Sequence, residues 1–261
     1  MITSSANQKV RQIVRWQQKA KERREAGVFL TEGFKLFEEA PAEMVREVYV
    51  SQGALEKNDC YAVRDKLDNL GYETVTDDIF SKMSDTRTPQ GILCVLRQPQ
   101  YSLERLLSGD APLLAVLENI QDPGNLGTIL RTGEGAGITG VIMSKKTVDI
   151  FNPKTIRATM GSIFRVPFLY VEDLQDTIRS LQKKGIRTYA AHLEGKRYYD
   201  SFSFRGGTAF LIGNEGGGLS RETAELAEEY LKIPMEGKVE SLNAAVAASL
   251  LFYEAQRQRR A

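Results

Sequence analysis

The chain has 261 residues, of which 42% are hydrophobic and 26% are charged, a composition typical of globular domains. No apolar stretch approaches the roughly 20 residues that span a bilayer, and residues 1–27 lack an apolar secretory core. Two cysteines and one histidine, His192, argue against a disulfide framework, a multi-histidine metal site and a serine–histidine–aspartate triad. We therefore expect mature, cytoplasmic protein with no membrane segment and no metal.

The first 24 residues are strongly basic, although the net charge of the chain is only +1. Glu22 is the one acid among seven lysine and arginine residues. Ser4, Ser5 and Asn7 offer capping oxygens for a helix that is predicted to run to about Arg24. A one-signed charge run is either a solvated helix face or a phosphate-binding surface, and both readings stay open here.

The rest of the first third alternates helix and strand, which predicts a small α/β unit. Phe34, Leu36 and Phe37 suit a helix after Gly33, and residues 53–70 are predicted to form one continuous helix. Strands are predicted at 47–51, 72–75 and 91–98. The stretch around Pro99 is a candidate linker.

From residue 111 onward the alternation is more regular. Strands are predicted at 112–118, 140–144, 167–171, 187–192, 208–213 and 230–234. Helices are predicted at 125–137, 153–164, 171–185, 220–229 and 241–258. This order favours a parallel sheet with helices on both faces. The last helix is apolar almost all round, which predicts burial between the sheet and a partner subunit.

Three segments rich in glycine, asparagine and acids follow predicted strand ends: ENIQDPGNLGTILRT (118–132), FLIGNEGGGLS (210–220) and KIPMEGKVESLNAAVA (232–247). Ligands of open α/β sheets bind outside the carboxyl ends of the strands. The glycines of GNEGGG either form a plain turn or let the backbone approach a ligand with free N–H groups. Asn125 and Ser241 are predicted helix N-caps. Neither a dinucleotide-binding GxGxxG unit nor a GxxxxGK[ST] loop is present.

These three segments resemble, in order and with typical spacing, the three motifs of the SpoU/TrmH family of RNA ribose 2′-O-methyltransferases, in the SPOUT class. The resemblance covers about residues 112–257 and includes NPKTIRATMGSIFRVPF between the first two motifs. The first third is similar, more loosely, to the family's N-terminal substrate-binding domain through FLTEG and TPQGILCV. Gly133 and Gly135 depart from the family, in which alanine is commoner.

The resemblance implies an α/β fold in two domains. Residues 1–105 would form a small α/β RNA-binding domain, and residues 106–261 a SPOUT methyltransferase domain with a deep trefoil knot that forms a homodimer. Arg11, Arg15 and Lys19 of the basic helix would then contact RNA phosphates. The implied cofactor is S-adenosyl-L-methionine, and the residues expected to bind it are Gly213, Ile233, Leu242, Leu211, Met235 and Ser241.

The residues implied to be catalytic are Arg131, Asn125, Glu215 and Asn243. Family accounts let the arginine activate the ribose 2′-hydroxyl, sometimes as a base. Because a guanidinium is effectively always protonated, we favour a role as phosphate anchor and electrostatic stabiliser. Asn125 would orient Arg131 or the ribose, Glu215 would hold the arginine or accept a proton through water, and Asn243 would position the acceptor.

Three alternatives stay open beside ribose methylation of ribosomal RNA, which analogy favours. The same chemistry could act on transfer RNA. A related methyltransferase could act on a base or a protein. A non-catalytic RNA-binding protein of ribosome assembly could keep the fold, although such a protein has no reason to keep four polar groups in loops.

Overall fold

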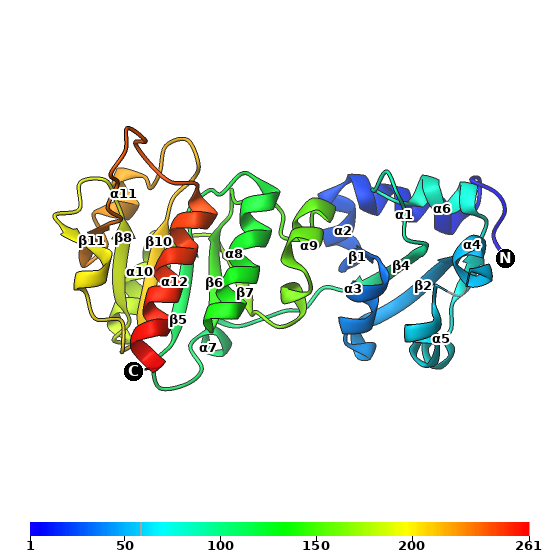
Figure 1. Ribbon diagram of the computed structural model, residues 1–261, viewed down its shortest axis with the longest axis horizontal. Coiled ribbons are helices and arrows are strands. Elements are labelled where there is room, and N and C mark those ends of the chain that lie inside the picture. Colours follow the sequence, from blue (N-terminus) through cyan, green and yellow to red (C-terminus); the bar gives the residue numbers. More distant parts are fainter. Residues whose placement is uncertain (58, 261) are drawn as a thin grey trace. The chain divides into compact units, whose positions relative to one another are not determined.

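The computed structural model describes residues 1–57 and 59–260 and divides into two compact units (Figure 1). The first unit comprises Met1–Pro99 and Asp149–Phe164. The second comprises Gln100–Val148 and the described residues from Arg165 onward. Thus a segment from the second half of the sequence packs with the N-terminal unit. No described helix is both long enough and apolar enough to cross a membrane.

The first unit contains a four-stranded sheet of order β1-β4-β2-β3, in which only β2 and β3 run parallel. Its strands are β1 (Val28–Glu32), β2 (Val45–Ser51), β3 (Glu73–Val75) and β4 (Ile92–Arg97). Its α-helices are α1 (Gln8–Gln18), α2 (Ala20–Ala26), α3 (Phe34–Glu39), α4 (Gln52–Glu56), α5 (Arg64–Leu70), α6 (Asp77–Met83) and α9 (Pro153–Thr159). Short 3-10 turns lie at η1 (Ala42–Met44), η2 (Tyr61–Val63) and η3 (Ser162–Phe164).

The prediction of one basic helix to Arg24 is wrong, because the chain is extended at Lys19 and separates α1 from α2. The cause is a tertiary contact. The buried Arg23 side chain donates to the backbone carbonyls of Trp16 and Gln17, at the end of α1, and to Asp149 at 2.6 Å. The guanidinium therefore satisfies carbonyls that a longer helix would have bonded internally.

The single helix predicted over residues 53–70 is also wrong. The structure has α4, the 3-10 turn η2 and α5 in its place. Cys60 and Val63 are both buried in the core of the unit. The sequence prediction also missed β1 and α6, whereas the caps by Asn7 and the strands β2, β3 and β4 are confirmed.

The second unit contains a seven-stranded sheet of order β7-β6-β5-β10-β8-β11-β9, parallel throughout its described strands. The strands are β5 (Leu113–Leu117), β6 (Gly140–Ser144), β7 (Phe168–Val171), β8 (Arg187–Ala191), β9 (Arg197–Tyr198), β10 (Thr208–Ile212) and β11 (Glu229–Lys232). All but the two-residue β9 match the strands predicted from the sequence. The strands β5, β6 and β10 are buried along their whole length, as expected for the centre of a parallel sheet.

The helices of this unit are α7 (Leu103–Leu106), α8 (Pro123–Ala136), α10 (Leu174–Lys183), α11 (Arg221–Ala224) and α12 (Ala244–Arg260), with the 3-10 turn η4 (Tyr199–Ser201). The last helix packs on α8 and β10 through one face only. Val246, Leu250 and Tyr253 on its opposite side are exposed. Within one chain, therefore, α12 is not buried on every side.

The end of α12 is fixed by Arg259, whose guanidinium reaches four carbonyl oxygens of two other segments. It donates to Phe204 at 2.8 Å, Ala111 at 2.8 Å, Pro112 at 3.5 Å and Gly206 at 2.7 Å. The neighbouring Arg257 instead pairs with Glu254 of its own helix and is mostly exposed. The two arginines thus offer a matched pair for measuring what the clamp contributes.

We predict that Arg259→Met lowers the free energy of unfolding by roughly 1–3 kcal/mol, because charge-assisted bonds to four carbonyls are lost while the aliphatic packing remains. Arg257→Met should cost less than about 0.5 kcal/mol, as exposed ion pairs within a helix do. Urea unfolding followed by circular dichroism measures both. Equal losses in the two variants would show that Arg259 does not clamp the helix.

Candidate functional site

The first motif leaves β5 through a braced turn. Asn119 has a φ of 56°, in the left-handed region that asparagine tolerates, and Ser144 at the end of β6 donates to its side-chain oxygen at 2.9 Å. Asp122 caps α8 by accepting from the backbone N–H of Asn125 at 2.9 Å, and Pro123 occupies the first helical position. The prediction that Asn125 is the N-cap is therefore wrong. Its side chain is free for contacts with the other motifs.

The second motif forms a self-bonded glycine turn after β10. The side-chain oxygen of Asn214 accepts from the N–H groups of Gly216 at 2.9 Å and Gly217 at 2.6 Å. Asn214 and Gly218 also exchange two backbone hydrogen bonds of 3.1 Å. Of the two readings left open by the sequence, the N–H groups of Gly216, Gly217 and Gly218 fit the plain turn, because all three are already hydrogen-bonded to Asn214. A Cβ on Gly213 would lie 1.9 Å from the carbonyl carbon of Gly218, so only glycine fits there.

The third motif caps the last helix with Asn243, not with Ser241 as predicted. The Asn243 side-chain oxygen accepts from the backbone N–H groups of Ala245 at 2.9 Å and Val246 at 3.3 Å. Ser241 lies in the exposed loop before the helix. The sequence predicted that the Asn243 side chain would position the acceptor. The capping bonds explain how this side chain is oriented.

One chain of hydrogen bonds joins the three motifs. Glu215 of the glycine turn accepts from the Asn125 side chain at 2.8 Å and from the backbone N–H groups of Gln121 and Asp122 at 3.1 and 3.2 Å. The Asn125 side-chain oxygen accepts from Asn243 Nδ2 at 2.9 Å. Three of the four residues expected to be catalytic therefore lie together, although they are far apart in the sequence.

The environment of Glu215 lowers its pKa below the ordinary glutamate value. Partial burial acts in the opposite direction and raises it, but the hydrogen bonds from Asn125 and from nearby backbone N–H groups outweigh that effect. Glu215 is therefore a carboxylate at neutral pH whose lone pairs are largely used. Such a group orients its donors well and is a weak proton acceptor.

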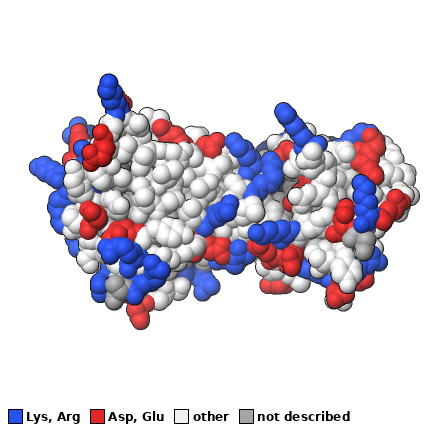
Figure 2. All heavy atoms as spheres, viewed as in Figure 1, with Lys and Arg blue, Asp and Glu red and all other residues white. Residues whose placement is uncertain are grey.

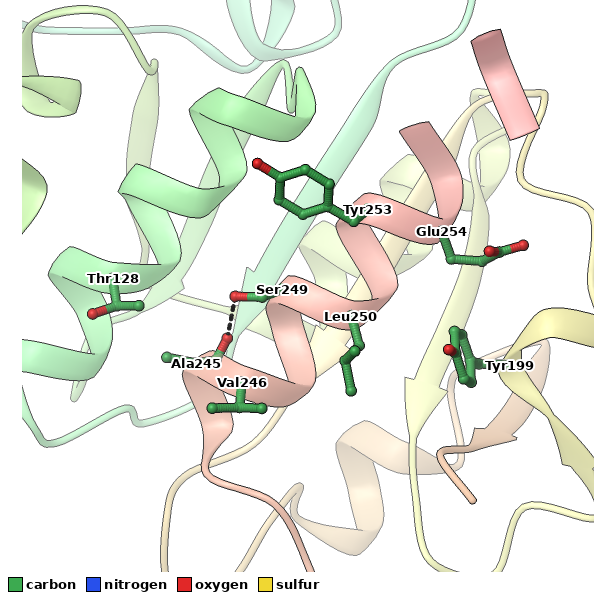
Figure 3. Close-up of a pocket in the computed structure, with 8 residues that line it drawn as sticks. All are labelled: Thr128, Tyr199, Ala245, Val246, Ser249, Leu250, Tyr253 and Glu254. Atoms are coloured by element: carbon green, nitrogen blue, oxygen red, sulfur yellow. Dashed lines mark hydrogen bonds between the residues drawn. The ribbon is translucent and has the colours of Figure 1, made fainter. Parts of the chain in front are cut away.

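The fourth expected residue, Arg131, lies apart from this network. Its side chain is exposed and makes no hydrogen bond or ion pair with any residue in the described part of the chain. On α8 it shares a face with Thr128 and Gly135, three residues before and four after it. Thr128 lines a hollow against α12 (Figure 3). Gly135 lies beside the Tyr253 hydroxyl. Arg131 therefore borders the exposed side of α12.

A pocket of about 440 Å³ opens beside the glycine turn, within the range of roughly 300–1,000 Å³ that small-molecule sites occupy. It is lined by five of the six residues predicted to bind a cofactor: Gly213, Ile233, Met235, Ser241 and Leu242. The sixth, Leu211, is fully buried inside β10 and does not line the pocket.

Another wall of the pocket, which was not predicted from the sequence, includes His192, Leu193 and Glu194. The His192 ring lies 4.9 Å from the Tyr230 ring, and its Nδ1 accepts from the backbone N–H of Glu194 at 3.3 Å. These residues follow β8, which lies between β10 and β11 in the sheet. Their place directly after a predicted strand was the signal that could have found them. No cluster of metal-ligating side chains occurs among the described residues.

In the first unit, Arg11 and Arg15 lie one turn apart on α1 and are exposed. They line a groove of about 680 Å³ with Trp16, Glu22 and Glu25 among its other walls. Lys19 lies at the break between α1 and α2, and its ammonium group is 3.9 Å from Glu22. In Figure 2, positive and negative side chains are intermingled on the face shown, so charge alone marks no nucleic-acid surface there.

Comparison with known proteins matches both parts of the chain. The SpoU rRNA Methylase family matches residues 112–253, and the MRM3-like substrate binding domain matches residues 7–94. The 23S rRNA (guanosine(2553)-2′-O)-methyltransferase RlmP of Bacillus subtilis is 34% identical over 254 residues, 97% of each chain.

Two solved structures are similar over nearly the whole chain. An AdoMet-bound rRNA methyltransferase from Sinorhizobium meliloti has a TM-score of 0.85 and 31% identity, covering 98% of this chain and 97% of its own. The SpoU methyltransferase AviRb from Streptomyces viridochromogenes, in complex with AdoMet, has a TM-score of 0.84 and 27% identity, covering 97% and 98%.

We predict that the stability difference between the unmodified protein and Glu215→Gln depends on pH only in acid. A carboxylate with a lowered pKa contributes stability above its unfolded value, about 4.3, and loses it as pH falls through the folded value. Urea unfolding should give a constant difference from pH 7 to about 5 and a shrinking one below about 4. Glu172→Gln, at an exposed ion pair with Lys145, is the control and should change little. A transition between about pH 6 and 8 would contradict the assignment and make Glu215 a candidate base.

Proposed function

The chain belongs to the SpoU rRNA methylase family, and we propose that it transfers the methyl group of S-adenosylmethionine to a ribose 2′-hydroxyl of ribosomal RNA. The observation that carries this proposal is the hydrogen-bonded set Glu215–Asn125–Asn243, which stands beside the pocket. It brings the three family motifs to one place. The relatives named above as rRNA methyltransferases, one of them bound to AdoMet, support the substrate and the cofactor.

The residues of the pocket fit S-adenosylmethionine, which supplies an activated methyl group on a sulfonium. Ile233, Met235 and Leu242 offer apolar surface for an adenosyl group. The carboxylates of Glu194 and Glu240 complement the positive charges of the sulfonium and the amino group. The absence of a side chain at Gly213 lets the backbone of Gly218 close against the end of β10, and Gly213 itself contributes to the wall of the pocket.

The two asparagines of the network are oriented to meet the acceptor. Because the Glu215 carboxylate only accepts, the nitrogen of Asn125 faces it and the oxygen faces Asn243. Each amide nitrogen then keeps one N–H that is not used by the network. We assign these N–H groups to holding the ribose and stabilising its oxygen as the proton leaves. Glu215 acts by fixing Asn125.

Arg131 is assigned to the phosphate next to the target ribose. A guanidinium binds a phosphate bidentately and favours nearby negative charge. Since the Arg131 side chain makes no hydrogen bond or ion pair with the described residues, it is available to bind RNA. Contact would both position the acceptor and stabilise the developing alkoxide.

The N-terminal region, residues 1–105, is assigned to binding RNA and residues 106–261 to methyl transfer. The match of residues 7–94 to a substrate-binding domain supports this division. Arg11 and Arg15 are exposed without an acid partner in the described chain, so they can contact phosphates; Lys19 extends the same basic edge. A cytoplasmic location fits a ribosomal RNA substrate.

We assign a homodimer to the catalytic domain. Val246, Leu250 and Tyr253, at spacings of four and three along α12, are 48%, 38% and 48% exposed. They flank the hollow of Figure 3, and in Figure 2 the surface over α8 and the first turns of α12 is broadly free of charged side chains, which gather at the C-terminal end of α12. An apolar helix face of this kind is suited to a second copy. The trefoil knot stays a proposal that rests on membership of the family.

Incubation with methyl-labelled S-adenosylmethionine and ribosomal RNA, followed by digestion to nucleosides, tests the function. The expected product is a 2′-O-methylated nucleoside, and mapping ribose methylation in cells with and without the protein locates it. Label in a base or in protein would support the rival methyltransferases, and transfer RNA as the labelled species would replace ribosomal RNA. If calorimetry detects no binding of S-adenosylmethionine, the non-catalytic assembly role is favoured.

We predict that Arg131→Ala lowers kcat by at least about 100-fold, the loss typical when a transition-state stabiliser is removed. The Kd of S-adenosylmethionine should change less than about twofold, because the residue does not line the pocket. Arg179→Ala, an exposed arginine paired with Asp176, is the control and should retain activity. Near-normal turnover by Arg131→Ala would remove it from the mechanism.

Replacing Arg11, Arg15 and Lys19 together with glutamine should weaken RNA affinity and reduce the salt slope of binding by about two to three. The control removes the same charge at Arg64, Lys82 and Arg179, which are all exposed and ion-paired within their helices. Filter binding at several salt concentrations measures the slopes. An equal change in both triple variants would mean that net charge, not the α1 surface, governs binding.

Leu250→Asp should convert the dimer to a monomer, because a carboxylate would be buried in the apolar interface without a partner. Size-exclusion chromatography with light scattering gives the mass directly. Tyr61→Asp, at a tyrosine that is 77% exposed in the first unit, should leave the dimer intact. A monomeric unmodified protein, or a dimeric Leu250→Asp, would exclude this interface.

A further inference from the structure

Glu118 is a buried carboxyl group at the carboxyl end of β5, and the mechanism above does not use it. Its side chain is only 7% exposed and follows five fully buried apolar residues. It accepts three hydrogen bonds of 2.7 Å, from the backbone N–H and hydroxyl of Ser220 and from the hydroxyl of Thr223. All three donors lie directly after the glycine turn of the second motif.

Burying a carboxyl group at this position costs free energy, so stability alone does not explain why it is there. Buried polar groups cost free energy unless they are hydrogen-bonded, and well-packed apolar residues often replace them without loss. Glu118 meets that condition through donors from one short segment, Ser220–Thr223. The arrangement therefore specifies where this segment lies relative to β5.

The glycine turn needs such fixed ends. It bonds to itself through Asn214 and Gly218, and its glycines have no side chains to anchor it to the rest of the protein. At its tip Glu215 binds the start of α8, which belongs to the first motif. At its exit Ser220 binds Glu118, which also belongs to the first motif. Each of the two motifs thus contributes one carboxyl group that binds the other motif: Glu215 binds the first motif, and Glu118 binds the second.

We propose that Glu118 is a positioning residue that fixes the exit of the glycine turn and thereby shapes the wall of the S-adenosylmethionine pocket. Gly213 and Leu219, at the two ends of the turn, both line that pocket, whereas Glu118 does not. The inference rests on the proposed cofactor. Glu118 therefore acts on the ligand through Ser220 and Thr223.

The test compares Glu118→Leu with the conservative Glu118→Gln by calorimetry with S-adenosylmethionine and by thermal unfolding. Leucine keeps the buried volume but removes every acceptor, and it should raise the Kd of S-adenosylmethionine at least about tenfold. Glutamine still accepts from the Ser220 N–H, and the two hydroxyls can reverse to accept from its amide. It should therefore raise the Kd by less than about threefold. Thr223→Val, which removes one donor without changing shape, should fall between them.

A control lies beside the same sheet. Glu228, which is exposed and directly precedes β11, accepts from the backbone N–H of the buried Thr188 at 2.9 Å and lies 3.5 Å from its hydroxyl, away from the glycine turn. Glu228→Leu and Thr188→Val should lower the melting temperature while leaving the Kd within about twofold. If Glu118 had a merely structural role, its variants would behave like these controls: their melting temperature would fall, and their Kd for S-adenosylmethionine would stay within about twofold.

The two levels of the proposal fail in different ways. If the unmodified protein binds S-adenosylmethionine and Glu118→Leu and Thr223→Val bind it equally well, the positioning role is overturned and the function stands. If the unmodified protein binds none, the proposed function is overturned and the inference with it. A Glu118→Leu variant that does not fold leaves Thr223→Val to decide, and an unchanged Kd there also overturns the role.

Discussion

The parallel pairing of β5 with β10 is the constraint on which the site depends. Its register sets Leu117 opposite Ile212, so the chain leaves both strands at the same edge and level. Glu118 and Gly213 are the next residues on either side, and the first and second motifs begin there. The strand pairing alone therefore places side by side two segments that are almost a hundred residues apart in the sequence. The polar contacts between the first and second motifs are built on this adjacency.

The pairing of β5 with β10 brings the first two motifs together, and the carboxyl groups of Glu118 and Glu215 then fix their relative positions. A strand end places a loop to within a few ångströms, but a glycine turn has little to hold it further. Glu118 and Glu215 provide directional acceptors that only one arrangement of the donors satisfies. Hydrogen bonds fix the third motif in a similar way, since Asn243 both caps α12 and donates to Asn125. The hydrogen bonds of Asn243 therefore both cap α12 and help to set the geometry of the site.

The sequence was sufficient for features that repeat locally and insufficient for those that depend on distant partners. The buried strands β5, β6 and β10 read as continuous apolar runs, which is what a parallel sheet requires. The break at Lys19 has no local signal, because its cause is the contact of Arg23 with Asp149. The same holds within the site, where the residue types pointed to the right loops but not to their bonds. Asn125 is a plausible cap until Asp122 is seen in that position, and the glycine N–H groups look free until Asn214 is seen to accept from them.

The position of Arg131 gives the proposed dimer a chemical reason. The asparagine network lies at the start of α8, whereas Arg131 lies six residues further along, on the face shared with Thr128 and Gly135. A rise of about 1.5 Å per residue separates the two by roughly 9 Å along the helix axis. Within one chain the arginine thus points to the margin of the exposed apolar side of α12 and not to Glu215. A second copy packed on that side would enclose Arg131 in the interface, where desolvation strengthens its attraction for a phosphate. Dimerisation and catalysis would then depend on the same helix face, and the exposed residues of α12 would serve the reaction without touching the substrate.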